Sequence, residues 1–266
     1  MSVLRPARTE GGHHQLWRVA RRSLPLLIAA EAVLVAGAAV PGSSLTPPRD
    51  PDLATLRQEM EPSVVDTITF AEPAGTQILG TGIVVSSTGL VLTDYHVIRG
   101  NIYIGVRVGG LGDVHQAVVV TSDAADDLAL LQIEGGPAGK PAQLAAASIV
   151  KVGEPVVAIG NAMGLDVEPG AAAGHLVALN RPVSYGVGGE VVTLARAMEA
   201  ATPIFTGDSG GPLVDGGGRV IGMIAAGSDD NPCAPAATCP LHVTYAVPIH
   251  QALAQIHFRP GPEQSG

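Results

Sequence analysis

The chain has 266 residues, of which 46% are hydrophobic, 15% are charged and 3% are aromatic. This length suits one large domain or two small ones, and the core has to be built from Val, Ile, Leu and Ala. The formal net charge is −9, and such an acidic protein argues against nucleic acid as a partner.

The N-terminal segment is basic and is followed by an apolar stretch. Residues 1–22 carry five Arg and one Glu, hence +4, and with −9 overall the rest carries −13. Residues 24–40 are 17 mostly apolar residues, long for a signal peptide's apolar region and short for a membrane span. The arginines place residues 1–23 in the cytoplasm. We therefore expect 24–40 to be a signal peptide or a membrane anchor helix and the remainder to be exported; a buried helix of the folded domain is the alternative.

Residues 41–58 are interpreted as a linker, with four Pro between residues 41 and 52. Residues 53–65 have the pattern of a short helix that ends before Pro62. The chain then changes to short β-branched runs separated by Gly, Asn or Asp. The expected strands are 64–70, 80–86, 89–94, 101–108, 115–123, 127–133, 154–160, 174–180, 191–196, 210–215, 219–226 and 242–248.

Strands at this spacing, with no helices between them, predict an all-β antiparallel sandwich or barrel. About twelve strands are too many for one small barrel. Residues 136–148 have the composition of a connection between two halves, and residues 249–258 have the spacing of a closing helix.

Three polar segments carry the residue types that nucleophilic catalysis needs. His96 follows an apolar strand, Asp126 and Asp127 precede another, and Ser209 lies in "TGDSGGPL" (206–213). A serine hydroxyl is a weak nucleophile unless a base takes its proton, and the base works best when a carboxylate orients it. Each segment alone is better explained as an ordinary turn, loop or core position. Together they provide one nucleophile, one base and one orienting acid.

The glycines around Ser209 add a second chemical requirement. Glycine has no Cβ and permits tight backbone conformations. The N–H groups of Gly207, Asp208 and Ser209 are therefore candidates to point inward and stabilise an oxyanion.

These segments resemble the motifs of the trypsin/chymotrypsin-like serine proteases. "GDSGGP" (207–212) matches their nucleophile motif at every position. "TDYHV" (93–97) and "DDLALL" (126–131) resemble the His and Asp motifs of the bacterial HtrA/DegP branch. The resemblance covers about residues 60–258. It implies a protease domain at 59–260 with two six-stranded antiparallel β-barrels, about 60–136 and 148–248, and a C-terminal helix.

The resemblance also implies the roles of individual residues. His96 would be the general base, Asp127 its orienting partner and Ser209 the nucleophile, with the N–H groups of Gly207 and Ser209 as the oxyanion hole. The reaction would be hydrolysis of a polypeptide substrate through an acyl-enzyme, without metal or cofactor. HtrA proteins usually carry a PDZ domain after the protease, and none is expected in the few residues that follow the last matched helix.

The specificity pocket is placed by the geometry of the same family. Its base is expected six residues before the nucleophile, and its walls on two later strands. None of these residues is charged, and one bulky side chain is expected to shorten the pocket. The expected pocket residues are Pro203, Ile204, Ala225, Ala226, Gly227 and Val243.

The two cysteines, Cys233 and Cys239, lie six positions apart in "NPCAPAATCP". An exported location permits a disulfide between them, which is our expectation. The alternatives are two free thiols or half of a metal site.

Two other functions compete with an active endopeptidase. A catalytically silent protease fold that serves as a binding or scaffold protein would have the same sequence pattern. An esterase with a "GxSxG" nucleophile elbow is disfavoured, because that elbow needs an alternating α/β chain with Ser before Asp and His.

Overall fold

The computed structural model describes residues 52–71, 76–135, 139–146, 150–161, 168–228, 242–261 and 264. All of them belong to the second of two units into which the chain divides, Met1–Leu45 and Thr46–Gly266. The expected signal peptide or anchor helix at 24–40 and the expected Cys233–Cys239 disulfide lie outside the described residues. Within the described ranges, no helix is long and apolar enough to cross a membrane.

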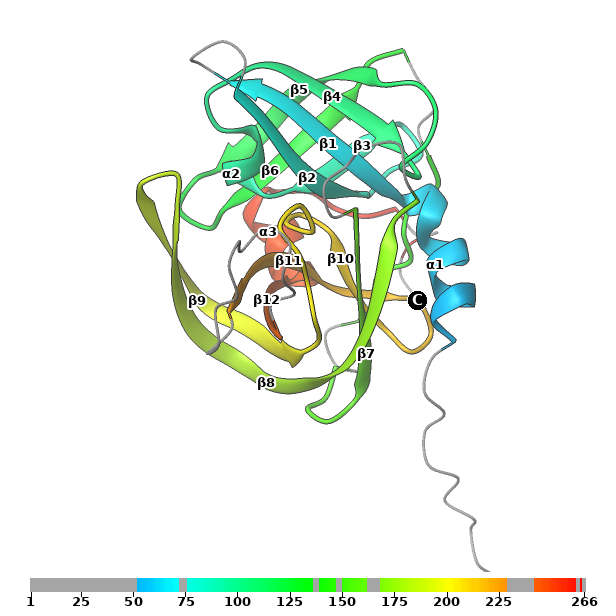
Figure 1. Ribbon diagram of the computed structural model, residues 1–266, viewed down its shortest axis with the longest axis vertical. Coiled ribbons are helices and arrows are strands. Elements are labelled where there is room, and N and C mark those ends of the chain that lie inside the picture. Colours follow the sequence, from blue (N-terminus) through cyan, green and yellow to red (C-terminus); the bar gives the residue numbers. More distant parts are fainter. Residues whose placement is uncertain are drawn as a thin grey trace, which may run out of the picture. The chain divides into compact units, whose positions relative to one another are not determined.

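The first six strands form a closed antiparallel barrel (Figure 1). The strand order is β1-β2-β3-β6-β5-β4, and β1 closes the sheet by pairing with both β2 and β4. The strands are β1 (Val64–Ala71), β2 (Thr76–Val84), β3 (Leu90–Thr93), β4 (Asn101–Val108), β5 (His115–Asp123) and β6 (Leu128–Ile133).

The last six strands form a second closed antiparallel barrel, in the order β10-β11-β12-β9-β8-β7. The strands are β7 (Pro155–Gly160), β8 (Gly170–Val187), β9 (Glu190–Ala201), β10 (Pro212–Asp215), β11 (Val220–Ser228) and β12 (Val243–Pro248). The predicted fold class of two six-stranded antiparallel barrels is thereby confirmed.

Short helices flank the barrels. Helix α1 (Leu53–Met60) is capped by the side chain of Asp52, and Pro62 lies in the following 3-10 turn η1 (Glu61–Ser63). Helix α3 (Ile249–Gln255) follows the last strand, as expected. The four-residue helix α2 (Tyr95–Ile98) was not predicted, and it carries His96.

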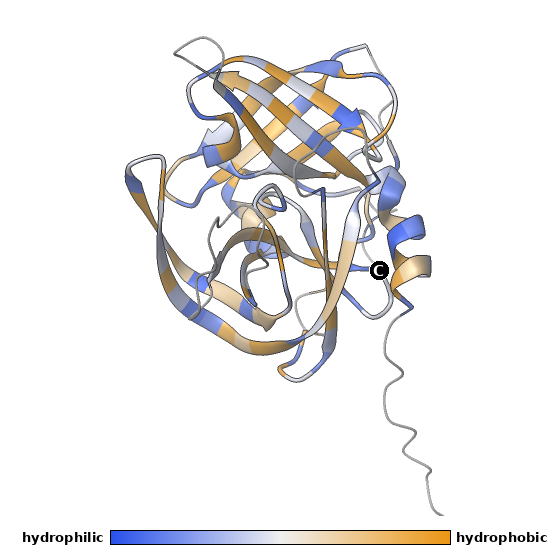
Figure 2. Ribbon diagram, in the orientation of Figure 1, coloured by the Kyte–Doolittle hydropathy of each residue, from blue (hydrophilic) through white to orange (hydrophobic). Residues whose placement is uncertain are grey.

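Aliphatic side chains fill three core clusters. One cluster lies among the strands of the first barrel and includes Val65, Val91 and Leu131. Another lies among the strands of the second barrel and includes Leu176 and Leu213. The third, called the shared core here, takes residues from both barrels and from α1 and α3. Bands of high and low hydropathy alternate along the strands, as expected where successive side chains point to opposite faces (Figure 2).

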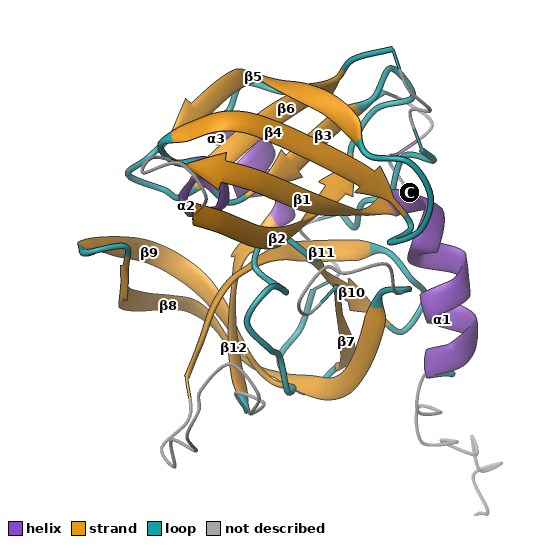
Figure 3. Ribbon diagram, turned by 45° about the horizontal axis from the view of Figure 1, so that its top comes forward, coloured by secondary structure: helices purple, strands orange, loops and turns teal. Residues whose placement is uncertain are grey.

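The β8–β9 hairpin is much longer than the sequence pattern predicted. We expected strands at 174–180 and 191–196, whereas β8 and β9 run on to meet at a two-residue turn, Gly188-Gly189. Both glycines have left-handed backbone angles, with φ of 56° and 84°, which suits the tight turn of a hairpin. The hairpin reaches from the second barrel to the side of the first where α2 lies (Figures 1 and 3).

Candidate active site

His96 is presented at the end of a rigid strand. Strand β3 is hydrogen-bonded to both β2 and β6. Its last residue, Thr93, donates from Oγ1 to the carbonyl of Thr81 on β2 at 2.7 Å. Helix α2 begins two residues later and holds His96, whose side chain is 14% exposed. The imidazole is thus fixed by the barrel and still open to solvent.

Asp127 binds His96 through both of its carboxylate oxygens. His96 Nδ1 lies 2.6 Å from Asp127 Oδ2, and the His96 backbone N–H donates to Oδ1 at 2.7 Å. The Tyr95 N–H donates to the Asp127 carbonyl at 3.1 Å. Asp127 has a φ of 55°, a left-handed conformation that Asp tolerates better than most residues. These contacts hold the imidazole with its Nδ1 proton toward Asp127, which leaves Nε2 as the basic nitrogen.

The neighbouring acids have other partners. Asp126 Oδ2 accepts a hydrogen bond from Gln255 Nε2 of α3 at 2.5 Å. Asp123 Oδ1 accepts from the N–H groups of Ala125 and Asp126. Of Asp123, Asp126 and Asp127, Asp127 is the one that contacts His96.

A tyrosine that the sequence analysis did not identify completes the surroundings of Asp127. Tyr185, on β8, donates from its hydroxyl to Asp127 Oδ2 at 2.7 Å. Burial by itself raises the pKa of Asp127. The hydrogen bonds from His96, the charge of His96 and the hydrogen bond from Tyr185 act in the opposite direction, and together they lower this pKa below its usual value. Burial and the charges of Asp94 and Asp127 raise the pKa of Tyr185, so its phenol stays protonated and donates.

Asp94 is a second buried acid beside this pair. Its side chain is fully buried, and its Oδ2 lies 3.9 Å from His96 Nδ1. Burial and the charge of Asp127 raise the pKa of Asp94 well above its usual range. The ligand atoms of Asp94, His96 and Asp127 lie within 4.8 Å of one another. Because His96 Nδ1 and Asp127 are hydrogen-bonded to each other, we assign no metal to this cluster.

Strand β2 holds the loop that carries Ser209. Thr81 donates from its backbone N–H to the Ser209 carbonyl at 2.8 Å and from Oγ1 to the Gly207 carbonyl at 2.7 Å. The next residue, Gly210, has a φ of 85°, and a Cβ there would lie 2.1 Å from the Thr81 carbonyl and 2.4 Å from Thr93 Oγ1. A glycine is required at this close approach, which places Ser209 beside the strand that leads to His96.

Two backbone N–H groups of this loop have no acceptor among the residues that the structure describes. The N–H groups of Asp208, Gly210 and Gly211 donate to carbonyls of Phe205, Ile224 and Asp208. No acceptor within the described ranges takes the N–H of Gly207 or Ser209. Both groups are therefore available to an oxygen that arrives at Ser209. Ser209 Oγ and His96 Nε2 likewise have no hydrogen-bond partner in the part of the chain that the structure describes.

The expected pocket residues fall into three groups. Ile204 and Ala225 are core residues, 3% and 2% exposed. Pro203 lines a cavity of about 300 Å³ together with Phe205 and Asp208. The other three, on neighbouring strands β11 and β12, are half-buried: Ala226, Gly227 and Val243.

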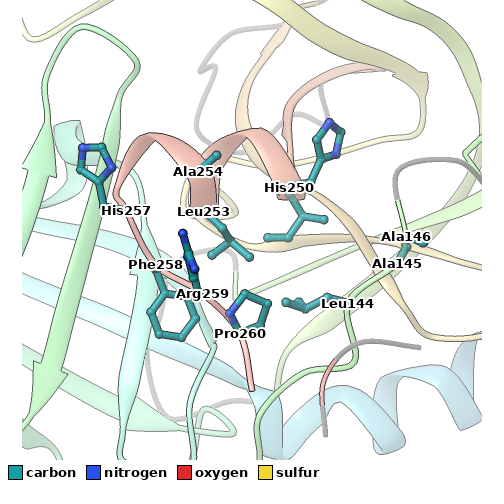
Figure 4. Close-up of a pocket in the computed structure, with 11 residues that line it drawn as sticks. Leu144, Ala145, Ala146, His250, Leu253, Ala254, His257, Phe258, Arg259 and Pro260 are labelled. Atoms are coloured by element: carbon teal, nitrogen blue, oxygen red, sulfur yellow. The ribbon is translucent and has the colours of Figure 1, made fainter. Parts of the chain in front are cut away.

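A cavity of about 530 Å³ lies elsewhere, along α3. Its apolar lining includes Leu253, Phe258 and Pro260 from the C-terminal segment and Leu144 from the connection between the barrels (Figure 4). None of the residues predicted to take part in catalysis or in substrate binding lines it.

Comparisons with known proteins identify a family and related structures. The family model of the trypsin-like peptidase domain matches residues 80–223. The serine protease PepD of Mycobacterium tuberculosis is 32% identical over 186 residues, which cover 65% of this chain and 39% of PepD. The chain thus spans about two fifths of the length of that relative.

Two solved structures share the fold. The Rv3671c protease from M. tuberculosis, in its active form, is 26% identical with a TM-score of 0.63, and the match covers 88% of this chain and 99% of that one. The HtrA-type protease AlgW with a tripeptide is also 26% identical, with a TM-score of 0.64, over 77% of this chain and 62% of that one.

Proposed function

Because the chain belongs to the trypsin-like peptidase family, we propose that it is a serine endopeptidase that hydrolyses peptide bonds through an acyl-enzyme at Ser209. One observation carries the proposal. A histidine hydrogen-bonded to an ionised, buried aspartate lies on helix α2, just after the strand that contacts the Ser209 loop, and this loop has two N–H groups without acceptors among the described residues.

The first half of the reaction forms the acyl-enzyme. Ser209 Oγ attacks the carbonyl carbon of the substrate, and its proton passes to His96 Nε2. The positive imidazolium is stabilised by Asp127, which is ionised and 2.6 Å away. The negative oxygen of the tetrahedral intermediate accepts hydrogen bonds from the N–H groups of Gly207 and Ser209. The C–N bond of the intermediate then breaks, and His96 gives the proton to the leaving amine.

The second half releases the acid product. A water molecule attacks the ester carbonyl while His96 Nε2 takes one of its protons. The same two N–H groups stabilise the second tetrahedral intermediate. Its collapse breaks the bond to Ser209 Oγ, and His96 protonates that oxygen, which restores the free enzyme.

The experiment that tests this function compares the natural chain with Ser209→Ala on a library of peptides, with sequencing of the products. We expect the natural chain to cleave internal bonds and Ser209→Ala to lose at least about three orders of magnitude of rate. Equal cleavage by both proteins would reject Ser209 as the nucleophile. A natural chain that binds peptides without cleaving them would instead support the alternative function, a catalytically silent binding or scaffold protein.

We also propose that the protease domain is exported, either secreted or held at the membrane by residues 24–40. The basic residues 1–23 and the apolar run support this proposal. N-terminal sequencing of the protein from fractionated cells tests it. A new N-terminus near the end of residues 24–40 would indicate a signal peptide. An intact chain in the membrane fraction would indicate an anchor, and an intact cytosolic chain would contradict export.

An exported domain permits a disulfide between Cys233 and Cys239, which we propose on their spacing. A loop this short stabilises a fold by roughly 2 kcal/mol. Mass spectrometry of the exported protein after alkylation is expected to find neither thiol modified. Two alkylated cysteines would contradict the disulfide.

A further inference from the structure

The inner face of the β8–β9 hairpin packs against the shared core. On β8, Val183, Tyr185 and Val187 are half-buried, while Ser184 and Gly186 between them are exposed. On β9, Val192 and Leu194 continue the same face. This hairpin is therefore fixed over the shared core, and Tyr185 is the residue on its inner face that reaches Asp127.

We propose that the β8–β9 hairpin positions Asp127 for catalysis, with Tyr185 as the hydrogen-bond donor and Arg99 as the side chain that holds the hairpin tip. Tyr185 is a positioning residue, because it acts on the substrate only through Asp127 and His96. The inference rests on the proposed function, since it assigns a further residue to the same reaction.

The contacts of Asp127 show why a further donor matters. Oδ1 accepts from the His96 backbone, and Oδ2 is shared by His96 Nδ1 and the Tyr185 hydroxyl. With both oxygens bonded, the carboxylate cannot rotate away from the imidazole. His96 and Asp127 belong to the first barrel, whereas Tyr185 and Ser209 belong to the second. Tyr185 therefore ties the base and its acid to the barrel that carries the nucleophile.

Arg99, from the first barrel, holds the tip of the β8–β9 hairpin. It directly follows α2, three residues after His96. Its Nη2 donates to the Gly188 carbonyl at 2.8 Å, and its Nη1 lies 2.6 Å from Glu190 Oε2. A Cβ at Gly188 would lie 1.8 Å from Arg99 Nη2, whereas a Cβ at Gly189 would meet nothing within 4 Å. A side chain at Gly188 would therefore displace the Arg99 guanidinium, whereas a side chain at Gly189 would not.

The first test removes only the hydroxyl. In Tyr185→Phe the ring still packs against the shared core, and we expect kcat to fall about tenfold, because a hydrogen bond to a charged group is lost. KM for a peptide should not change, and the rate of Ser209 labelling by a fluorophosphonate should fall by the same factor as kcat. Tyr103→Phe, at an exposed position on β4, is the matched control and should keep the natural kcat.

The second test displaces the hairpin tip. Gly188→Ala should lower kcat severalfold, whereas Gly189→Ala should not, although Gly189 has the larger positive φ and the greater backbone strain. Because Gly188→Ala acts through Tyr185, combining it with Tyr185→Phe should lower kcat little further than Tyr185→Phe alone. Equal losses in the two alanine variants would overturn the role of Arg99.

The outcomes separate this inference from the proposed function. If Ser209→Ala cleaves peptides as fast as the natural chain, both fall together. If Ser209→Ala is inactive but Tyr185→Phe keeps the natural kcat, the serine protease stands and the role of Tyr185 is overturned. A purely structural role is also distinguishable, since it would lower Tm and leave kcat of the folded protein unchanged.

Discussion

At the scale of single residues, hydrogen bonds distinguish acids that the sequence places side by side. Asp126 and Asp127 both precede β6, and either could reach a histidine that follows the adjacent strand β3. The left-handed backbone of Asp127 directs its side chain to His96, whereas Asp126 bonds to Gln255 of α3. The two residues therefore allow a comparison between the acid that orients His96 and a neighbouring acid that does not contact it.

We predict that Asp127→Asn lowers kcat/KM by about 10³- to 10⁴-fold, because an amide does not stabilise the imidazolium and favours the wrong tautomer of His96. Asn also tolerates a positive φ, so the variant should fold. Asp126→Asn should lower kcat/KM by less than about threefold. Steady-state kinetics on one peptide compares them, and a larger loss in Asp126→Asn would show that Asp127 is not the orienting acid.

Asp94 is predicted to make stability depend on pH. Its pKa is raised in the folded protein, so the unfolded chain releases a proton that the folded chain keeps. The resulting cost is absent below the ordinary Asp pKa of about 3.9 and grows as the pH rises toward the folded value. Asp94→Asn should therefore be more stable than the natural chain at pH 8, by about 1 kcal/mol or more, and equally stable near pH 4.

Thermal unfolding at both pH values measures this difference. Asp113→Asn is the matched control, because Asp113 is exposed and should change little at either pH. A pH-independent difference between Asp94→Asn and the natural chain would contradict a neutral buried Asp94.

At the scale of elements, close packing between β2 and α2 sets the position of His96. A Cβ at Gly80 of β2 would lie 2.6 Å from Val97 Cγ1 and 2.7 Å from Val97 Cγ2. Val97 is buried and follows His96 directly. Valine is stiff at χ1, so it cannot turn aside and the helix itself would have to move.

Gly80→Ala should therefore lower the free energy of unfolding by about 1–3 kcal/mol, the usual cost of overpacking. It should also lower kcat, because His96 moves with α2. Gly216→Ala, where a Cβ meets nothing within 4 Å, should change stability by less than about 0.5 kcal/mol. Chemical denaturation and peptide kinetics test the pair, and a Gly80→Ala variant as active as Gly216→Ala would contradict this packing argument.

The elements differ in how far the sequence could predict them. The β-branched runs locate all twelve strands, because alternating burial acts on each strand separately. Strand ends are less predictable, since they depend on the partner: β2 begins at Thr76, where it pairs with Ala71, rather than at Gly80. The outer half of the β8–β9 hairpin has alternating Val183, Tyr185 and Val187 and a Gly-Gly turn, which is a hairpin signal, although the predicted strands did not include this half.

At the scale of the whole molecule, the site joins parts of the chain that are far apart in sequence. The His, Asp and Ser segments carry recognisable motifs, which is why the sequence predicts His96, Asp127 and Ser209 as a set. Tyr185 has no motif, and its partner is 58 residues away, so the fold alone reveals the contact. The burial of Asp94 is likewise a property of the packed barrels.

The uncharged residues expected at the specificity pocket predict the substrate preference of the enzyme. Neither Pro203 nor Ile204 offers a counter-ion to Arg or Lys, whose burial would be costly. Val243 should shorten the pocket and favour Ala, Val or Leu over Phe and Tyr, by about 10- to 200-fold. Matched peptides that differ only at the residue before the cleaved bond measure this. Val243→Gly should shift the preference to larger residues, and faster cleavage after Arg or Lys would refute the pocket.

The central claim is that His96 and Asp127 activate Ser209 for attack on a carbonyl, and covalent labelling tests it most directly. A fluorophosphonate should modify the natural chain once, at Ser209, as mapped by mass spectrometry of its peptides. Labelling should disappear in Ser209→Ala and become at least about 10³-fold slower in His96→Ala. An unlabelled natural chain, or a label on another residue, would contradict the account.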